Sequence, residues 1–214
     1  QNHRQQGIFQ DDFLLAIPPC LSSLNKLIYD ERIKLIVEEM GISVYPSPLE
    51  IYLYENKRFL SDWLSVNSLP HPKTYVYLSE KQFGSALKSF KFPIVAKTNI
   101  GSSGKGVVIL KDPKELEQYF KKSFSTSGVP KIVGPKRKLN VAMNLLKGIT
   151  SYKMILEKLR KYWLELAEKQ VGMVILQEYI EHDYEWRVVC IGDSYFAHKK
   201  IKIGEKASGS LKKE

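Results

Sequence analysis

A glycine-rich loop between two short apolar runs constrains the fold of this chain more than any other feature of its sequence. The runs are 92–97 (FPIVAK) and 107–110 (VVIL), and the loop between them is 98–106 (TNIGSSGKG). Short runs rich in β-branched residues are typical of strands, and a glycine-containing connection between two of them favours an antiparallel hairpin. Because the first run ends in Lys97, the sequence predicts a hairpin with positive charge at the base of a mobile loop.

The loop has the composition of a phosphate-binding segment. Gly101, Gly104 and Gly106 leave the backbone free to approach a ligand, and their N–H groups can point at phosphate oxygens. Lys97 and Lys105 bring positive charge to the same place. A plain hairpin with a loose tip is the alternative that this segment alone leaves open.

Two widespread phosphate motifs are excluded by the residues around these glycines. A P-loop requires Ser or Thr directly after its lysine, whereas Lys105 is followed by Gly106. A dinucleotide fingerprint requires its glycines to open a helix, whereas the last two loop glycines open the strand-like run 107–110. A glycine loop that covers phosphates between antiparallel strands is the geometry that remains.

The rest of the chain alternates between helical and strand patterns. Apolar periodicity and capping residues predict helices at 30–40, 55–66, 79–90, 112–122 and 151–169. Strands are predicted at 74–78, 92–97, 107–110, 173–180, 186–191 and 195–203, the last two joined by a turn at Gly192 and Asp193. The stretches 45–48 and 123–140 are predicted to lack regular structure. Hairpins beside helices predict an α+β fold and argue against a doubly wound parallel sheet.

Composition narrows the class of protein. The chain has 214 residues, enough for one large domain or two small lobes, and no apolar run approaches the length needed to cross a bilayer. Cys20 and Cys190 form neither a paired zinc motif nor a disulfide framework, and Cys190, inside an apolar run, is predicted to be buried. We therefore expect a reducing, cytoplasmic setting. The formal net charge of +10 favours an anionic ligand without naming it.

A second pair of motifs follows the predicted helix 151–169. The run 174–180 (VILQEYI) ends in polar residues, and after a short acidic link the run 185–193 reads EWRVVCIGD. Together with the lysine-ended strand and the glycine-rich loop, this order resembles the ATP-grasp superfamily over residues 56–200, and it is most similar to the glutamate-ligase-like branch. The resemblance implies an ATP-grasp fold, in which two α+β lobes hold ATP between them.

The resemblance assigns phosphate contacts to the lysines and to the loop. Lys57 matches the first ATP-contacting lysine, and Lys97 matches the second, which touches the α-phosphate and the adenine side. The residues that match the loop closing over the β- and γ-phosphates are Ser102, Ser103, Gly104 and Lys105. Lysines suit this role because a charged hydrogen bond contributes about 1.5–3 kcal/mol. For Lys57, an ordinary surface position is the alternative.

The resemblance assigns the base, the ribose and the reacting group to the segment after the helix. The residues that match the adenine-reading hinge, partly through backbone groups, are Gln177, Glu178, Tyr179 and Ile180. Glu185 matches the acid that binds the ribose hydroxyls, and Arg187 matches a basic residue near the phosphates or an acyl-phosphate, which makes it the candidate catalytic residue. Glu185 and Arg187 are two apart on a strand and so share a face, and an ion pair between them is the alternative. Glu178 as a surface residue is another.

The resemblance also implies a division of the chain. Residues 1–69 are expected to be the tail of a preceding domain with linking helices, and 70–176 the small lid subdomain with the glycine-rich loop. Residues 177–214 are expected to begin a C-terminal subdomain that is truncated here. The resemblance places the Mg²⁺ ligands of such enzymes beyond residue 214, so no metal ligand is assigned within the chain.

The implied activity is that of an ATP-dependent ligase. ATP would phosphorylate the carboxylate of a small molecule or peptide, and an amine or thiol would displace phosphate from the acyl-phosphate. A kinase on the same fold and a non-catalytic nucleotide-binding module are the alternatives. A nucleic-acid-binding protein is supported only by the charge, so neither nucleic acid nor a membrane is an expected partner.

Overall fold

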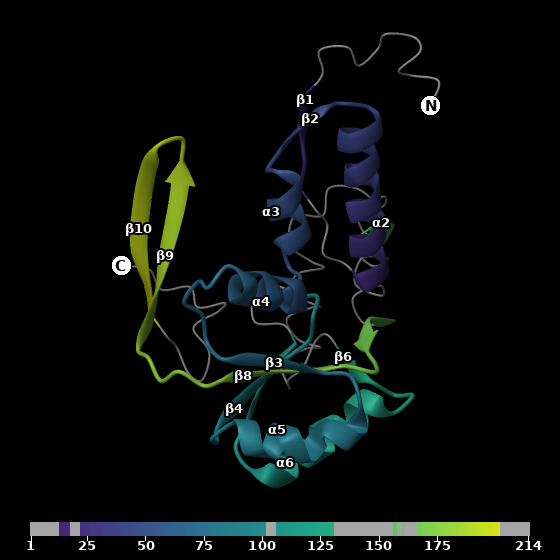
Figure 1. Cartoon of the computed structure of the whole chain (residues 1–214), viewed down its shortest axis with the longest axis vertical. Coiled ribbons are helices and arrows are strands. Elements are labelled where there is room, and N and C mark those ends of the chain that lie inside the picture. Colours follow the sequence, from purple (N-terminus) through teal and green to yellow (C-terminus); the bar gives the residue numbers. More distant parts are fainter. Residues whose placement is uncertain are drawn as a thin grey trace.

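The computed structural model describes residues 13–17, 22–101, 106–130, 156, 157, 160 and 167–201. Within them it is a mixture of helices and mainly antiparallel strands, which confirms the predicted α+β class. Figure 1 shows three parts: an N-terminal group of helices and strands, a central sheet with its helices, and a long hairpin that projects beside them. None of the helices in the described part of the chain is both long and apolar enough to cross a membrane.

The N-terminal part packs two helices against a small parallel sheet. Strand β1 (Phe13–Leu15) pairs in parallel with β2 (Ser43–Tyr45). Between them runs α2 (Ser23–Lys34), which continues as a π-helical turn, η1 (Leu35–Glu39). Helix α3 (Pro48–Leu53) follows β2. The buried side chains at the centre of this part are Ala16, Ile33 and Ile51.

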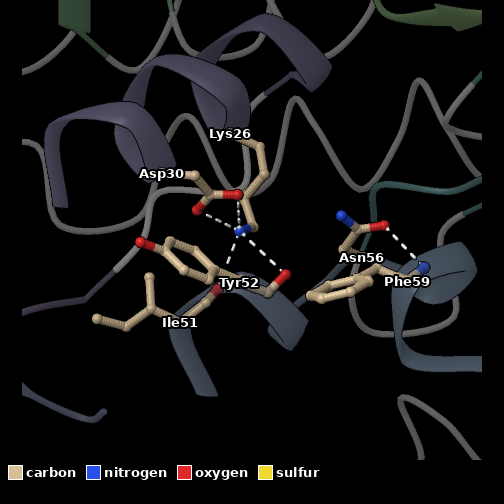
Figure 2. Close-up of polar contacts among 6 residues, drawn as sticks. All are labelled: Lys26, Asp30, Ile51, Tyr52, Asn56 and Phe59. Atoms are coloured by element: carbon tan, nitrogen blue, oxygen red, sulfur yellow. Dashed lines mark hydrogen bonds and ion pairs between the residues drawn. The ribbon is translucent and has the colours of Figure 1, made fainter. Parts of the chain in front are cut away.

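A buried lysine joins α2 to the end of α3. The Lys26 ammonium lies 2.5 and 2.6 Å from the two carboxylate oxygens of Asp30 and also donates to the carbonyls of Ile51, at 2.9 Å, and Tyr52, at 3.4 Å (Figure 2). These carbonyls belong to the last turn of α3, where helical partners are missing and a cation is favourable. Lys26 therefore acts as a C-terminal cap supplied by another helix.

The chain then turns directly into α4 (Lys57–Val66). Asn56 caps this helix, because its side-chain oxygen accepts from the Phe59 N–H at 3.2 Å (Figure 2). Asn56 also forms an isolated antiparallel bridge with Ile100, in the glycine-rich segment. The N-terminus of α4 is thereby placed against the base of that loop.

The central sheet has four antiparallel strands. Their order is β3 (Thr74–Tyr77), β8 (Val174–Glu178), β4 (Ile94–Lys97) and β5 (Val107–Leu110). The late strand β8 is thus inserted between two early ones. The predicted hairpin 92–110 is confirmed, since β4 and β5 pair from Ile94 with Leu110 to Lys97 with Val107.

Two helices cover one face of this sheet. They are α5 (Phe83–Ser89), preceded by the 3₁₀ turn η2 (Glu80–Gln82), and α6 (Pro113–Phe124). Both lie on the side of the sheet opposite α4 in Figure 1. The main core fills the space between these helices and the sheet, with Ile94, Ala96 and Leu176 fully buried. Because side chains alternate along a strand, the odd-numbered residues of β4 and β8 occupy the other face.

Two smaller strand pairs complete the described chain. Strand β6 (Val129–Pro130) pairs with β7 (Lys169–Gln170), and β9 (Tyr184–Ile191) pairs with β10 (Ser194–Ile201) through the predicted turn at residues 192 and 193. Every residue of β9 is exposed. The prediction that Cys190 is buried is therefore wrong: the thiol is exposed and donates to the Gly192 carbonyl at 3.2 Å.

Several element boundaries differ from those expected. The helix expected at 30–40 begins at residue 23, because Ser22 caps it by accepting from the Asn25 N–H. Pro48 begins α3, because Ser47 and Glu50 form a capping box and proline suits the first helical position. The helix expected at 79–90 divides into η2 and α5 after a similar box at Ser79.

The stretch expected to be irregular from 123 is regular at its start. Helix α6 extends to Phe124, and Val129–Pro130 forms β6. Residues 131–140 lie outside the described residues, as does most of the helix expected at 151–169. Lys169, its expected end, lies in β7 instead, because its backbone pairs with Pro130.

Candidate functional site

The sheet face away from α5 and α6 carries the polar side chains of the site. Lys97, at the end of β4, faces Ile175 on β8 and Val107 on β5 across the two neighbouring strands. Gln177 is two residues beyond Ile175 and faces Thr74 on β3. The residues Thr74, Gln177 and Lys97 therefore lie on one face of three adjacent strands.

These three side chains form a continuous hydrogen-bonded row. The Lys97 ammonium donates to the Gln177 side-chain oxygen. The Gln177 amide nitrogen donates to the Thr74 hydroxyl at 3.0 Å, and that hydroxyl donates to the Pro72 carbonyl at 2.8 Å. The row fixes the place at which the positive charge of Lys97 stands.

Burial and a nearby acid act in opposite directions on Lys97. Removal from water lowers the pKa of the Lys97 ammonium from its ordinary value, and the negative charge of Glu185 raises it. Burial is the larger effect. The assignment of Lys97 and Glu185 to one nucleotide stays a prediction, and the effect of the Glu185 charge on the Lys97 pKa is compatible with it.

The second predicted lysine holds the base of the glycine-rich loop. The Lys57 ammonium donates to the carbonyls of Gly101, at 2.6 Å, and Asn99, at 3.3 Å. Its backbone N–H donates to the same Asn99 carbonyl at 3.1 Å, and the next N–H, of Arg58, donates to the Asn99 side-chain oxygen at 2.8 Å. In this structure Lys57 thus stabilises the entry to the loop.

The other side of the loop base is held from β7. The Gln170 side-chain oxygen accepts from the Asn99 N–H at 2.6 Å, and its amide nitrogen donates to the Met173 carbonyl at 2.9 Å. The exit of the loop is closed by a 2.9 Å bond from the Thr98 N–H to the Gly106 carbonyl. The predicted phosphate-contacting residues Ser102, Ser103, Gly104 and Lys105 lie outside the described residues.

The predicted adenine hinge begins at the end of β8. Glu178 is engaged with β3, because its carboxylate accepts from the Lys73 N–H at 2.7 Å and its own N–H donates to the Lys73 carbonyl at 2.9 Å. The Glu178 side chain therefore helps to hold β3 and β8 together. A contact between Glu178 and adenine stays a prediction. Ile180, farther along, is exposed, and its carbonyl lies 2.7 Å from His182 Nδ1.

A shallow pocket lies beside this hinge. It is lined by Phe92, Pro93, Ile109, Lys111 and Tyr179. Two aromatic rings, two aliphatic side chains and one lysine form a surface on which a flat heterocycle can stack. Of the four predicted hinge residues, Tyr179 is the one that lines this pocket.

One face of the projecting hairpin carries charged side chains. Glu185 lies opposite Lys200, and Arg187 lies opposite His198. Alternation along the strands places all four on the same face. The Glu185 carboxylate lies 3.6 Å from His182 Nε2. The hairpin follows β8 directly and begins beside the sheet that carries Lys97 (Figure 1).

Solved structures with this arrangement of elements identify the fold. No family model matches the sequence. The chain is similar to N5-carboxyaminoimidazole ribonucleotide synthetase in its ADP complex, at 13% identity over 94% of this chain and 41% of that one, with a TM-score of 0.53. The Staphylococcus aureus enzyme with ADP gives 13% identity, coverage of 93% and 41%, and a TM-score of 0.53. The fold is that of ATP-grasp proteins.

A third structure agrees with the first two. The carboxyaminoimidazole ribonucleotide synthase from Aspergillus clavatus, complexed with ATP, gives 10% identity over 95% of this chain and 40% of that one, with a TM-score of 0.52. The chain therefore spans less than half the length of these three structures. At these identities the likeness establishes the fold and leaves the activity to the residues of the site.

Within this ATP-grasp fold, sequence reasoning missed three supporting residues. Thr74 holds Gln177, while Asn99 and Gln170 hold the loop base. Thr74 stands in a strand-like run, and its partner is 103 residues away. The pairing of β3 with β8, which joins Thr74 to Gln177, has no local sequence signature. The contact between Asn99 and Gln170 likewise joins residues that are far apart in the sequence, so only the folded structure reveals these three roles.

Proposed function

We propose that this chain binds ATP and forms the nucleotide-binding part of an ATP-dependent carboxylate–amine or carboxylate–thiol ligase. The observation that carries the proposal is the Lys97 ammonium, which Gln177 holds on the sheet face away from α5 and α6 and whose pKa the charge of Glu185 raises. The site thus combines a cation for the phosphates with an acid suited to a ribose diol. The ATP-grasp fold, shared with enzymes solved with ADP and ATP, supports the same ligand.

Each part of the nucleotide has a corresponding feature. The phosphates would lie at Lys97 and over the glycine-rich loop, whose base Lys57 holds. The adenine would stack in the pocket beside Tyr179 and meet the hinge there. The ribose hydroxyls would donate to Glu185. The lysines contribute through charge-assisted hydrogen bonds of about 1.5–3 kcal/mol each.

The reacting groups belong beyond the phosphates. We propose that Arg187, on the charged face of the hairpin, stabilises the transferred phosphoryl group or the acyl-phosphate of a small-molecule or peptide carboxylate. The spacing of the 174–180 and 185–193 motifs supports the glutamate-ligase-like branch. The proposal also includes the division of the chain into a preceding-domain tail (1–69), a lid subdomain (70–176) and the start of a C-terminal subdomain (177–214). A kinase would use the same nucleotide contacts with a different acceptor.

Mg²⁺ usually accompanies ATP in this fold. The part of the chain that the structure describes brings together no group of three His, Cys, Asp or Glu side chains. We therefore assign no residue to Mg²⁺ and derive no step through it.

Calorimetric titration with ATP and ADP, with and without Mg²⁺, tests the nucleotide site. We expect micromolar binding by the chain and a loss of about 10- to 100-fold in Lys97→Ala, equal to one charged hydrogen bond. Lys88→Ala is the matched control, since Lys88 is an exposed lysine on α5, across the sheet from the site. Equal weakening in both variants would point to general electrostatics and contradict the site.

Phosphate release separates the activities once binding is established. ATP hydrolysis or transfer that depends on an added carboxylate and amine would support the ligase. Phosphorylated product without a requirement for an amine or thiol would support a kinase. Tight binding with no turnover, in a longer chain that also carries the expected Mg²⁺ ligands, would identify a nucleotide-binding module.

A further inference from the structure

We infer that Thr74 and Gln177 are positioning residues that hold the Lys97 ammonium in the place and charge state in which it meets phosphate. This inference rests on the proposed nucleotide site and adds to it a function for β3, the strand farthest from the glycine-rich loop. The order of the sheet makes the link possible, because β8 stands between β3 and β4.

The register of the sheet sets the three side chains in line. Thr74 is directly opposite Gln177, and Gln177 is directly opposite Val95, two residues before Lys97 on the same face. Diagonal neighbours on adjacent strands are within reach of long side chains. The Gln177 side chain can therefore contact Thr74 and Lys97 at the same time without leaving its strand.

The direction of the hydrogen bonds determines which end of the amide faces the lysine. The Thr74 hydroxyl has one proton, which it donates to the Pro72 carbonyl at 2.8 Å. Its oxygen can then only accept, so the Gln177 amide must present its nitrogen there, at 3.0 Å. The amide oxygen consequently faces Lys97. Without the Thr74 hydroxyl, the ammonium, which can only donate, is the one group of this row that still holds the amide oxygen in this direction.

An oriented acceptor matters because Lys97 is withdrawn from water. Its neighbours in register, Val107 and Ile175, are uncharged, and burial lowers the pKa of its ammonium. Among the described residues, Glu185 supplies the opposing charge and the Gln177 oxygen supplies a fixed dipole. Both favour the protonated lysine. Among the residues that the structure describes, Gln177 uses one of the three ammonium N–H groups, which leaves two for a phosphate.

Three substitutions separate this role from simple packing. Thr74→Val keeps the shape of the side chain and removes the hydroxyl, and Thr74→Ser keeps the hydroxyl and removes a methyl group. Gln177→Leu removes the acceptor and tests the same link from β8. We expect the pKa of Lys97 to fall by about one unit in Gln177→Leu, to fall less in Thr74→Val, and to stay near the original value in Thr74→Ser.

The pKa of Lys97 is measured in the whole chain by carbon–nitrogen NMR of the lysine side chains, with Lys97→Arg identifying its signal. ATP affinity is measured in parallel at pH 7 and pH 9. Because a lowered pKa deprotonates the ammonium at lower pH, we expect affinity to fall with rising pH, and to fall more steeply in Thr74→Val and Gln177→Leu than in Thr74→Ser. Thermal unfolding verifies that each variant folds.

The two measurements distinguish this inference from the proposed function. A Lys97 pKa that shifts as expected in a chain that binds no ATP would support the positioning row and overturn the nucleotide site. ATP binding that weakens in Lys97→Ala, together with an unchanged Lys97 pKa in Gln177→Leu and Thr74→Val, would overturn the positioning role and leave the nucleotide site standing.

Discussion

At the scale of single residues, two lysines with buried ammonium groups have different tasks. Lys97 is half-buried, and within the part of the chain that the structure describes its ammonium donates to the Gln177 side chain. Lys26 is only 3% exposed and donates to Asp30 and to the last turn of α3. A lysine engaged on all sides has a structural role, whereas one engaged on one side can still meet a ligand.

Replacement of Lys26 by methionine should destabilise the chain. The substitution keeps the apolar stem but leaves the Asp30 carboxylate, 21% exposed, and two helix-end carbonyls without their cation. We expect a loss of about 3 kcal/mol in the free energy of unfolding by denaturant titration.

Lys34→Met in the same helix is the matched control. Lys34 and Glu38 are 63% and 56% exposed and 3.8 Å apart, so their pair is expected to contribute less than about 1 kcal/mol. A Lys26→Met variant as stable as Lys34→Met would show that the buried contacts of Lys26 contribute nothing to stability.

At the scale of elements, the short β6–β7 pair depends on a glycine. Gly128, just before β6, has a φ of +58°. A Cβ placed there would lie 2.7 Å from a methyl carbon of Val171 and 2.9 Å from the Gln170 carbonyl oxygen. Gln170 also holds the loop base through Asn99. The turn at Gly128 therefore supports, through β7, the element that carries the glycine-rich loop.

Three glycine-to-alanine variants measure what this turn requires. Gly128→Ala combines an unfavourable φ with a steric clash, and we expect it to destabilise by more than about 2 kcal/mol. Gly172→Ala has a φ of +74° but open space, and should cost about 1 kcal/mol. Gly84→Ala, in α5 with open space, should stabilise by about 0.5 kcal/mol. Thermal unfolding of the three gives the order, and a different order contradicts the assigned turn geometry.

At the scale of the whole molecule, the central sheet and the projecting hairpin differ in burial. The sheet buries Ile94, Ala96 and Leu176 against α5 and α6. In the hairpin, Trp186 is 59% exposed and Tyr195 76% exposed, although both are large apolar side chains. The proposed site would join these two parts, because Lys97 belongs to the sheet and Glu185 to the hairpin.

Hydrogen exchange should separate the two parts. Opening of the β9–β10 hairpin exposes little additional apolar surface, so we expect its amides to exchange faster than those of β4 and β8, by at least an order of magnitude. The measurement is amide exchange by mass spectrometry with fragments that cover Ile94–Lys97 and Tyr184–Ile191 separately. Equal protection of both fragments would show that the hairpin is packed against another surface in solution.

The local elements of this protein follow from short stretches of its sequence. The β4–β5 hairpin, the start of helix α6 and the turn at residues 192 and 193 were all predicted, because each depends on residues within a few positions of one another. The family motifs also brought Lys97 and Glu185 to the same predicted site. Ser22 and Ser47 are N-caps that the sequence-based prediction did not include, because the apolar periodicity does not mark the start of α2 or α3.

The way in which these elements meet depends on the packing of segments that are far apart in the sequence. The insertion of β8 between β3 and β4 brings together Thr74, Lys97 and Gln177, although the first and last are 103 residues apart. The contact of Lys26 with the end of α3 and the exposure of Cys190 also could not be predicted from the local sequence. Strand order and burial depend on the packing of distant segments, which no short stretch of sequence encodes. The polar row that holds Lys97 is therefore a property of the folded sheet.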